Sequence, residues 1–289
     1  MPNKFALFSR LGLGAIVPMD SAIAYKACVD VLRTFVHDAG FKDVVIGLSG
    51  GIDSSLVAIM AVDALGAEHV HGVLLPGPYS SDDSLSDAQQ LASNVGLPTY
   101  TIPIVEPYEA FAHVISDATG DSLAGLAAEN TQARCRMVCI MALSNANGWM
   151  MLNTGNKSEA AMGYSTLYGD TAGAFAPIGG LYKTEVFALS RWRNEEAERR
   201  GEVPPIPENV LTKPPSAELS PDQSDEASLG IDYPTLDAIL IALNEEGKSA
   251  DEVVEAGFPR SQVDMVANRY AGYAFKRAME PPFAEVQRH

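Results

Sequence analysis

The sequence predicts an α/β fold in which a doubly wound parallel sheet is flanked by helices. Short apolar runs alternate along the chain with segments whose apolar residues recur at helical spacing, and this alternation is typical of parallel sheets. A glycine-rich turn follows the first apolar run and precedes a helical pattern. Because ligands of such folds bind beyond the C-terminal ends of the strands, that turn marks the expected site.

Each expected strand is short and rich in apolar residues. The strands are expected at 44–48, 69–75, 99–104 and 150–153. The helices are expected at 21–39, 54–65, 82–95, 124–145 and 182–200. Gly40 ends the first helix, and Asp82, Asp83 and Ser84 offer capping groups at the start of the third. This order of elements predicts a Rossmann-like sheet.

The last part of the chain is expected to be helical. Residues 203–222 hold six of the eighteen prolines, so an extended loop is expected there rather than a helix. Three short helical patterns follow at 234–246, 249–256 and 260–278. Because no internal repeat or linker is visible, residues 1–289 are expected to form a single domain, with an N-terminal extension at 1–20 and C-terminal helices at 231–280.

Composition argues against several classes of protein. The net charge of −17 argues against broad nucleic-acid binding, which depends on a basic surface. No apolar run approaches the roughly 20 residues that span a bilayer. Glycines interrupt the apolar stretch at 11–17 and Pro18 ends it, which argues against a secretory signal. Cys28, Cys135 and Cys139 are too few for a disulfide framework and are expected to be small core residues in a reducing cytoplasm. We therefore expect no nucleic-acid or membrane partner.

The turn after the first strand has the sequence Ser49-Gly50-Gly51-Ile52-Asp53-Ser54-Ser55. Its backbone N–H groups and the positive end of the next helix point at one place, where phosphate oxygens bind. Asp53 adds a carboxylate of the kind that holds Mg²⁺. No lysine follows Gly51, so the turn is not a Walker loop, and it does not match the dinucleotide-binding glycine pattern. It resembles the pyrophosphate loop of the ATP-pyrophosphatase group, whose members adenylate a substrate and release pyrophosphate.

Four further segments carry polar residues that suit ligand binding. They are Glu129–Arg136, Asn153–Glu159, Tyr168–Asp170 with Leu181–Thr184, and Lys213–Glu218. Arg134 and Arg136 are two residues apart on an expected helix, so they diverge and at most one need face a ligand. Lys183 offers a point charge for phosphate, and Glu159 could share Mg²⁺ with Asp53.

Together these segments resemble the NAD synthetase family over roughly residues 25–280, because their order and spacing match although each is short. The resemblance implies a ligase that amidates deamido-NAD to NAD. ATP is the cosubstrate: it first adenylates the nicotinate carboxylate and releases pyrophosphate. Ammonia then attacks the adenylate and AMP leaves. Mg²⁺ is the implied cofactor, and the implied enzyme is cytoplasmic and usually a homodimer.

The same resemblance implies roles for individual residues. ATP is bound by Gly47, Leu48, Ser49, Gly50, Gly51, Ile52, Asp53, Ser54, Ser55, Thr154, Lys183 and Ser216. Deamido-NAD is contacted by Arg134, Tyr164, Leu167 and Lys276. Asp53 and Glu159 are the implied magnesium carboxylates, and Asp53 and Lys183 are the implied catalytic residues. Simpler interpretations stay open: Arg134, Lys183 and Lys276 could be ordinary surface charges, and Glu159 could merely interact with the positive end of its helix.

The nitrogen source is less determined. Ammonia-using members of the family carry a lysine where this chain has Leu167 and an acidic residue where it has Ala174. The segments 163–170 and 190–194 instead resemble the synthetase domain of glutamine-dependent members, which carry an N-terminal nitrilase-like glutaminase domain. Few residues precede the first expected helix, so we expect a synthetase domain without a glutaminase domain. Free ammonia is favoured as the donor, and ammonia from a separate glutaminase subunit is the alternative.

Two competing interpretations remain open. The chain could be another ATP-pyrophosphatase, such as GMP synthetase, a tRNA-thiolating enzyme or an asparagine-synthetase-like domain. It lacks the cysteine pair and the basic face that a thiolating enzyme is expected to show. It could instead be a nucleotide sensor that binds ATP without consuming it. The combination of Asp53, Glu159 and Lys183 favours catalysis over sensing.

Overall fold

The computed structural model describes residues 20–286 and 288. Its centre is a four-stranded parallel sheet with the strand order β3-β2-β1-β4. The strands are β1 (Val44–Gly47), β2 (Val70–Leu74), β3 (Thr99–Thr101) and β4 (Met150–Met151), and the short 3₁₀ helix η1 (Ala67–His69) leads into β2. In register, Val44 lies opposite Val70 on one side and Met150 on the other. The chain moves outward from β1 to β3 and then returns to the other side of β1, which confirms the Rossmann-like α/β fold.

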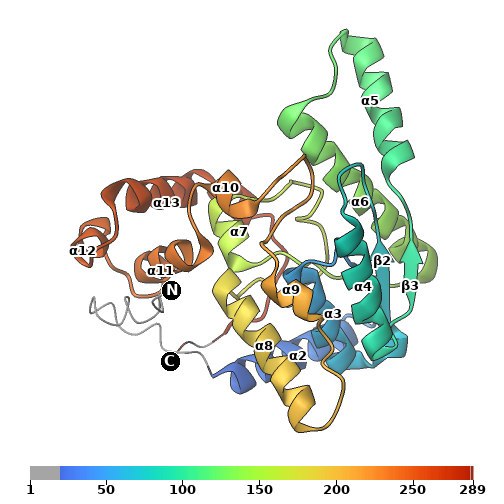
Figure 1. The fold of residues 1–289 in the computed structure, drawn as a ribbon, viewed down its shortest axis with the longest axis horizontal. Coiled ribbons are helices and arrows are strands. Elements are labelled where there is room, and N and C mark those ends of the chain that lie inside the picture. Colours follow the sequence, from blue (N-terminus) through green and yellow to red (C-terminus); the bar gives the residue numbers. More distant parts are fainter. Residues whose placement is uncertain (1–19, 287, 289) are drawn as a thin grey trace.

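Helices cover both faces of this sheet (Figure 1). On one face, α2 (Ser21–Asp38), α3 (Ile52–Leu65), α4 (Asp82–Val95) and α8 (Lys183–Arg199) share a hydrophobic core with the strands. On the other face lie α5 (Val105–Thr119) and α6 (Gly125–Asn147). Side-chain alternation along β1 explains the two layers, because Val44 and Ile46 enter the first core and Val45 enters the second.

Local sequence explains where the helices begin and end. Asp20 and Ser81 accept hydrogen bonds from the first-turn N–H groups of α2 and α4. Gly96, in the left-handed region, ends α4. The helix α3 begins at Ile52, two residues before the expected start, so Asp53 lies within its first turn. That position brings the Asp53 carboxylate to the N-terminal end of α3, where the loop begins.

The C-terminal helices are α10 (Asp225–Leu229), α11 (Tyr233–Asn244), α12 (Ala250–Glu255), α13 (Arg260–Gly272) and α14 (Ala274–Arg277). Of these, α11, α12 and α13 lie at the left of Figure 1. The helices α11, α13 and α14 pack against α7 (Lys157–Met162), and α11 also packs against α8. Met162 and Tyr182 join Leu236 and Val263 in a separate hydrophobic core there. The expected helical C-terminal region is therefore present, and it is joined to the half of the molecule that contains the sheet through α7 and α8.

The structure corrects several expected elements. Helix α5 was not among the expected elements. Its Pro107 lies in the first turn, where a helix tolerates proline. The stretch 203–222 contains the short helix α9 (Glu208–Thr212), because Val210 and Leu211 are buried in the main core and stabilise a helical turn between the prolines. The helix expected at 260–278 is broken at Tyr273 into α13 and α14.

The strands β3 and β4 are shorter than the expected 99–104 and 150–153. Cys28 and Cys135 are buried, Cys139 is partly buried, and all three are free thiols packed in hydrophobic clusters. The expected extension at 1–20 and its apolar stretch lie outside the described residues, except for residue 20 itself.

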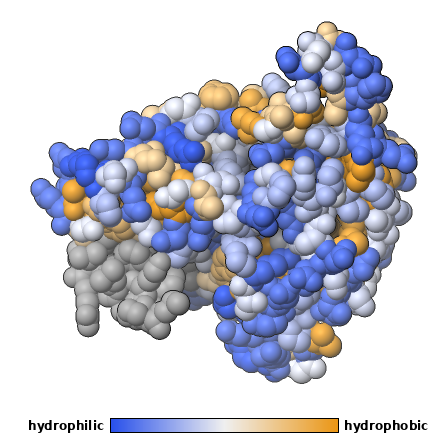
Figure 2. Space-filling model, turned by 45° about the horizontal axis from the view of Figure 1, so that its top comes forward, coloured by the Kyte–Doolittle hydropathy of each residue, from blue (hydrophilic) through white to orange (hydrophobic). Residues whose placement is uncertain are grey.

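The outer surface fits the acidic composition. Figure 2 shows a mostly hydrophilic face on which apolar residues form separate small patches. No residue of α5 is buried, and in Figure 1 this helix projects from the body beside the start of α6. Within the described residues, no helix combines the length and the apolar character needed to cross a membrane.

Candidate active site

The expected site lies in the crevice where the strand order reverses. β2 and β3 lie on one side of β1 and β4 lies on the other, so the loops after β1 and β4 diverge at the C-terminal end of the sheet. A cavity of about 340 Å³ opens there. Residues of the loop after β1, of the segment 152–156 and of the segment 213–219 line it. The fold thus brings together candidate segments that are far apart in the sequence.

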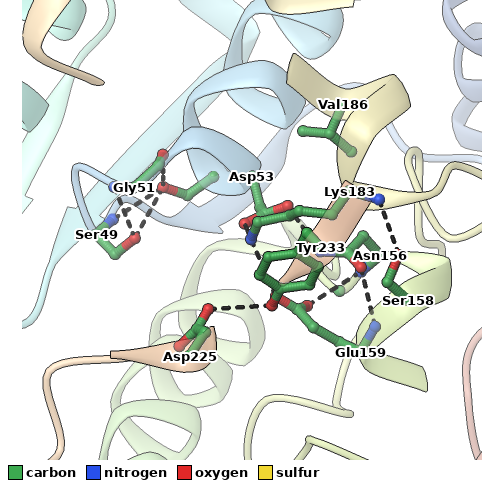
Figure 3. Close-up of polar contacts among 12 residues, drawn as sticks. Ser49, Gly51, Asp53, Asn156, Ser158, Glu159, Lys183, Val186, Asp225 and Tyr233 are labelled. Carbon is green, nitrogen blue, oxygen red and sulfur yellow. Dashed lines mark hydrogen bonds and ion pairs between the residues drawn. The ribbon is translucent and has the colours of Figure 1, made fainter. Parts of the chain in front are cut away.

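Serine hydroxyls shape the loop after β1. The Ser54 hydroxyl donates to the Gly51 carbonyl at 3.1 Å and accepts from the Ser49 N–H at 3.2 Å. The Ser49 hydroxyl accepts from the Gly51 N–H at 3.2 Å (Figure 3). Gly51 is the N-cap of α3 and provides no side-chain cap. The positive end of α3 therefore faces the cavity without a capping side chain, which is a suitable place for phosphate oxygens.

Gly50 allows this loop to approach α4. Its φ is +78°, in the left-handed region that glycine adopts readily. A Cβ atom at Gly50 would lie 2.0 Å from the backbone carbonyl oxygen of Ser84 in the first turn of α4. Glycine at position 50 is thus required by both the turn and the close contact.

Lys183 is the central cation of the site. Its side chain is 2% exposed, and its ammonium lies 2.5 Å from Asp53 Oδ2 and 3.2 Å from Glu159 Oε1 (Figure 3). Burial alone lowers the pKa of Lys183, but the two carboxylates outweigh burial and raise this pKa above its ordinary value. Lys183 therefore carries its positive charge at neutral pH.

Asn156 and Glu159 form a capping box at the start of α7. The Glu159 N–H donates to Asn156 Oδ1 at 3.0 Å, and Glu159 Oε2 accepts from the Asn156 N–H at 3.3 Å. Asn156 Nδ2 also donates to Asp53 Oδ1 at 2.9 Å, which ties α7 to α3 across the crevice. Glu159 thus caps its helix with one oxygen and faces Lys183 with the other. Burial raises the pKa of Glu159, Lys183 opposes that rise and Asp53 adds to it.

Asp225 brings a third carboxylate from α10. It is 4% exposed, and its Oδ2 accepts a hydrogen bond from the Tyr233 hydroxyl at 3.2 Å (Figure 3). Its Oδ1 is buried and has no hydrogen-bond partner among the described residues. The Tyr233 ring also lies 5.2 Å from the Lys183 ammonium, measured to the ring centroid. Burial raises the pKa of Asp225, which leaves a proton acceptor at the cavity wall.

The residues present fit the magnesium ion that the resemblance implies. Mg²⁺ in nucleotide sites is usually held by one or two carboxylates together with phosphate oxygens. Asp53 and Glu159 are such carboxylates, and both face the cavity. Burial raises the pKa of Glu159 to about 8, and when Glu159 and Asp225 are both ionised, Lys183 balances one of three negative charges, so the wall then retains an excess that suits a divalent cation. The described residues hold no cluster of three or more metal-ligating side chains, so phosphate oxygens would have to complete the coordination.

Most residues expected to bind ATP line the cavity. They are Gly47, Leu48, Ser49, Gly51, Ile52, Asp53, Ser54, Thr154, Lys183 and Ser216. Gly50 shapes the turn behind the lining, and the Ser55 hydroxyl donates to the Gly51 carbonyl at 2.8 Å. The Ser216 hydroxyl donates to the Gln223 carbonyl at 2.6 Å and so helps to fold its own loop. Contacts of these residues with ATP stay predictions.

The four residues expected to contact deamido-NAD are more dispersed. Tyr164 lines the cavity. The Lys276 ammonium donates to two carbonyl oxygens in the segment 163–165, at 2.8 and 2.5 Å, and burial lowers its pKa. Arg134 is exposed, and its Nε donates to the Leu167 carbonyl at 3.2 Å. Arg134, Leu167 and Lys276 lie outside the lining of the cavity, and their roles in substrate binding stay predictions.

Several polar residues of the cavity were not predicted as site residues, among them Asn156, Arg136, Lys213 and Asp225. Asn156, Arg136 and Lys213 lie inside the candidate segments, and Asn156 carried a recognisable signal as an N-cap residue before a helix. Asp225 carried no such signal, because it lies in a polar stretch far from the loop after β1 and reaches the cavity only through the packing of α10 and α11.

The NAD synthase family model matches residues 24–280. The chain belongs to the NAD synthase family. It is 45% identical over 261 residues to the glutamine-dependent NAD(+) synthetase of Thermotoga maritima, in an alignment that covers 90% of this chain and 44% of that protein. The chain thus spans about half the length of the curated family members it matches.

Solved structures of this family share the fold. The glutamine-dependent NAD+ synthetase from Acinetobacter baumannii, in complex with ADP, matches with a TM-score of 0.64 and 36% identity, covering 93% of this chain and 48% of that chain. The NH3-dependent NAD synthetase from Campylobacter jejuni subsp. jejuni, in complex with the nitrate ion, matches with a TM-score of 0.70 and 30% identity. That second match covers 89% of this chain and 96% of the Campylobacter chain.

Proposed function

We propose that the chain amidates deamido-NAD to NAD with ATP and ammonia, and that it releases AMP and pyrophosphate. The observation that carries the proposal is the buried Lys183 ammonium between Asp53 and Glu159, beside the uncapped N-terminus of α3. This arrangement suits a nucleotide whose phosphate groups change their charge during the reaction. Membership of the NAD synthase family supports the choice of acceptor.

The first half-reaction joins a nicotinate carboxylate oxygen to the α-phosphorus of ATP and breaks its bond to pyrophosphate. A carboxylate is a poor acylating agent because its leaving group would be oxide, whereas the mixed anhydride expels AMP. The N–H groups of α3 and the hydroxyls of Ser49 and Ser54 bind phosphate oxygens. Lys183 neutralises the charge that develops on pyrophosphate. When held by Asp53 and Glu159, Mg²⁺ would supply further neutralisation of the phosphates.

In the second half-reaction, the lone pair of ammonia attacks the adenylated carbonyl carbon. The bond to the AMP oxygen breaks, and the new ammonium-like nitrogen loses one proton to become the amide. Asp225 is our candidate for the proton acceptor, because it lines the cavity and burial raises its pKa, which favours protonation. Tyr233 holds the other oxygen and fixes the orientation of this carboxyl group.

We propose free ammonia as the nitrogen source, with ammonia from a separate glutaminase subunit as the alternative. A cytoplasmic homodimer is part of the proposal. Exposed apolar side chains on the projecting α5 and the start of α6 support an interface with a second copy: Phe111, Val114 and Leu126 are 48%, 58% and 71% exposed. The three free thiols support a reducing compartment.

NAD formation from deamido-NAD, ATP and Mg²⁺ tests the proposal, with ammonium or glutamine as the donor. We expect equal amounts of NAD and AMP with ammonium, and no NAD with glutamine. NAD from glutamine would contradict the assigned nitrogen source. ATP binding without AMP release would favour the nucleotide sensor. Amidation of xanthosine monophosphate instead of deamido-NAD would favour GMP synthetase.

A further inference from the structure

Three basic side chains line the cavity, and one of them lacks an acidic partner. Lys183 and Lys213 form ion pairs with carboxylates. Arg136 of α6 forms none within the part of the chain that the structure describes. Its one hydrogen bond there runs from Nε to the Leu75 carbonyl at 3.1 Å. The remaining guanidinium N–H groups of Arg136 are therefore unpaired.

The surroundings of Arg136 hold its guanidinium at the cavity. The bond to Leu75, at the end of β2, fixes one edge of the guanidinium plane. Gly77 provides the space next to it, because a Cβ atom at Gly77 would lie 2.7 Å from Arg136 Nη2. Arg136 lines the cavity, and neither of its terminal nitrogens is fully enclosed by the described residues.

Nearby acidic groups are already engaged elsewhere. Glu218 is the carboxylate whose charge acts most on Arg136. Its two oxygens accept hydrogen bonds from the backbone and hydroxyl of Ser81 and from the hydroxyl of Ser84, at 2.7 to 3.1 Å. Glu218 thus holds the segment 213–219 against α4, and its charge favours the ionised Arg136 without a direct hydrogen bond to it. The terminal N–H groups of the guanidinium keep no hydrogen-bond partner among the described residues.

An unpaired guanidinium in a partly buried position costs stability unless an anion binds it. Burial lowers the pKa of Arg136, but an arginine stays ionised in proteins. Its planar fork of N–H donors matches the oxygens of a phosphate group, which it can bind with two parallel hydrogen bonds. The ligand that completes this site is therefore expected to be an oxyanion.

We propose that Arg136 binds phosphate oxygens of a bound nucleotide through its two terminal nitrogens. This inference rests on the proposed function, which places two phosphate-bearing substrates, ATP and deamido-NAD, in one cavity. It also distinguishes the two arginines that diverge on α6. Arg136 faces the cavity of its own chain, whereas Arg134 lies at the exposed surface beside Leu167.

Calorimetric titration of the chain with ATP, deamido-NAD and adenosine tests this inference in wild type and in Arg136→Gln. We expect the substitution to weaken binding of at least one phosphate ligand by about 10- to 100-fold, as for the loss of a charged hydrogen bond. Adenosine, which has no phosphate, should bind both proteins equally. Arg191→Gln is the matched control, because its guanidinium also donates to a backbone carbonyl but lies outside the cavity.

The separate titrations identify the source of the phosphate. Weakened binding of ATP alone assigns Arg136 to the nucleoside triphosphate, and weakened binding of deamido-NAD alone assigns it to the dinucleotide. Wild-type affinity of Arg136→Gln for both ligands would overturn the inference, as would a wild-type chain that binds neither ligand.

If Arg136→Gln does not fold, Arg136→Lys is the second variant. It keeps the charge but loses the planar fork of N–H donors, and an unchanged affinity for both ligands would overturn the bidentate contact. A wild type that binds both without forming NAD would refute the proposed reaction only.

Discussion

The two walls of the cavity are built in different ways. One wall comes from a single continuous stretch, in which β1, the loop and α3 follow one another within residues 44–65. The opposite wall is assembled from α7, α8 and α10, so Glu159, Lys183 and Asp225 meet only through tertiary packing. The first wall presents backbone N–H groups, hydroxyls and the Asp53 carboxyl group, and the second presents Lys183 and two further carboxyl groups. The candidate phosphate site is thus formed locally by the chain, whereas the placement of Lys183 against the carboxyl groups depends on the whole fold.

A buried carboxylate of α11 holds the second wall in place. Asp237 is 0% exposed and accepts hydrogen bonds from the Ser158 hydroxyl at 2.5 Å and from the Thr184 N–H at 2.8 Å. The Lys183 N–H in turn donates to the Ser158 hydroxyl at 2.9 Å. The first turn of α8 is therefore fixed by α7 and α11 together. This arrangement sets the direction in which the Lys183 side chain leaves the helix.

Replacing the cation of the second wall should have the largest effect. We expect Lys183→Met to lower the rate of NAD formation by about 10²- to 10³-fold, because charge on departing pyrophosphate is no longer neutralised. Binding of ADP to the first wall should persist. Steady-state kinetics and ADP titration measure the two effects. Lys157→Met is the control, because Lys157 pairs with Glu245 outside the cavity. A Lys183→Met rate within threefold of wild type, on the order of experimental scatter, would contradict the assigned role.

A methyl group in the first wall should disturb phosphate binding instead. We expect Gly50→Ala to weaken ADP binding strongly and to destabilise the fold, because its Cβ would meet the Ser84 carbonyl oxygen at 2.0 Å. Gly96→Ala is the control: φ is +70° there, but no atom lies within 4 Å of the added carbon. Backbone strain of about 1–2 kcal/mol is common to both substitutions. Urea denaturation and ADP titration separate this strain from the steric effect. Equal losses of ADP affinity and of stability in the two variants would contradict a steric effect of the close contact at Gly50.

Loss of the anchor behind the second wall should have a smaller effect. We expect Asp237→Asn to lower kcat while the affinity for ADP stays unchanged, and to reduce the free energy of unfolding by about 1–3 kcal/mol. If the asparagine oxygen keeps the hydrogen bond from the Thr184 N–H, the amide nitrogen takes the place of Asp237 Oδ1. That nitrogen cannot accept the hydrogen bond that the Ser158 hydroxyl now donates. The exposed Asp251, changed to asparagine, serves as the control. An Asp237→Asn variant with wild-type kcat would exclude a positioning role.

The pH dependence of stability should show the smallest effect. Burial raises the pKa of Asp237 to about 6, above its unfolded value of about 3.9. The native state then takes up a proton as the pH falls through 6, while the unfolded chain does not, so protonation favours the native state at lower pH. Between pH 7 and 5, wild type should gain about 1 kcal/mol relative to Asp237→Asn. Urea denaturation at both pH values measures this difference, and a constant difference would contradict the raised pKa.

The difference between the two walls also explains which site residues could be predicted from the sequence. The loop after β1 could be located because strand, glycines and helix are adjacent in the chain, and the order of elements predicted the fold class that the structure confirms. Lys183 could be identified because it lies in the candidate segment Leu181–Thr184, at the start of an expected helix. Asp225 and Asp237 could not, since the first lies in a polar stretch and the second in an apolar helix, and both acquire their partners only when the C-terminal helices pack.

Helix α5 was missed for a related reason. None of its residues is buried, and the partly buried Tyr108 packs against a hydrophobic core. The first residues of α3 were placed in the turn rather than the helix, because glycines and serines there favour turns in the absence of tertiary contacts. In both cases the missing information is what the segment packs against.

Exchange of pyrophosphate into ATP, measured without ammonia, tests the central claim most directly. It isolates the proposed adenylation step, in which phosphates would bind at the loop after β1 and Lys183 would neutralise charge. We predict that labelled pyrophosphate enters ATP only when deamido-NAD is present, and that Lys183→Met abolishes this exchange. Tight ATP binding with no exchange in the presence of deamido-NAD, or exchange that does not require deamido-NAD, would contradict the account.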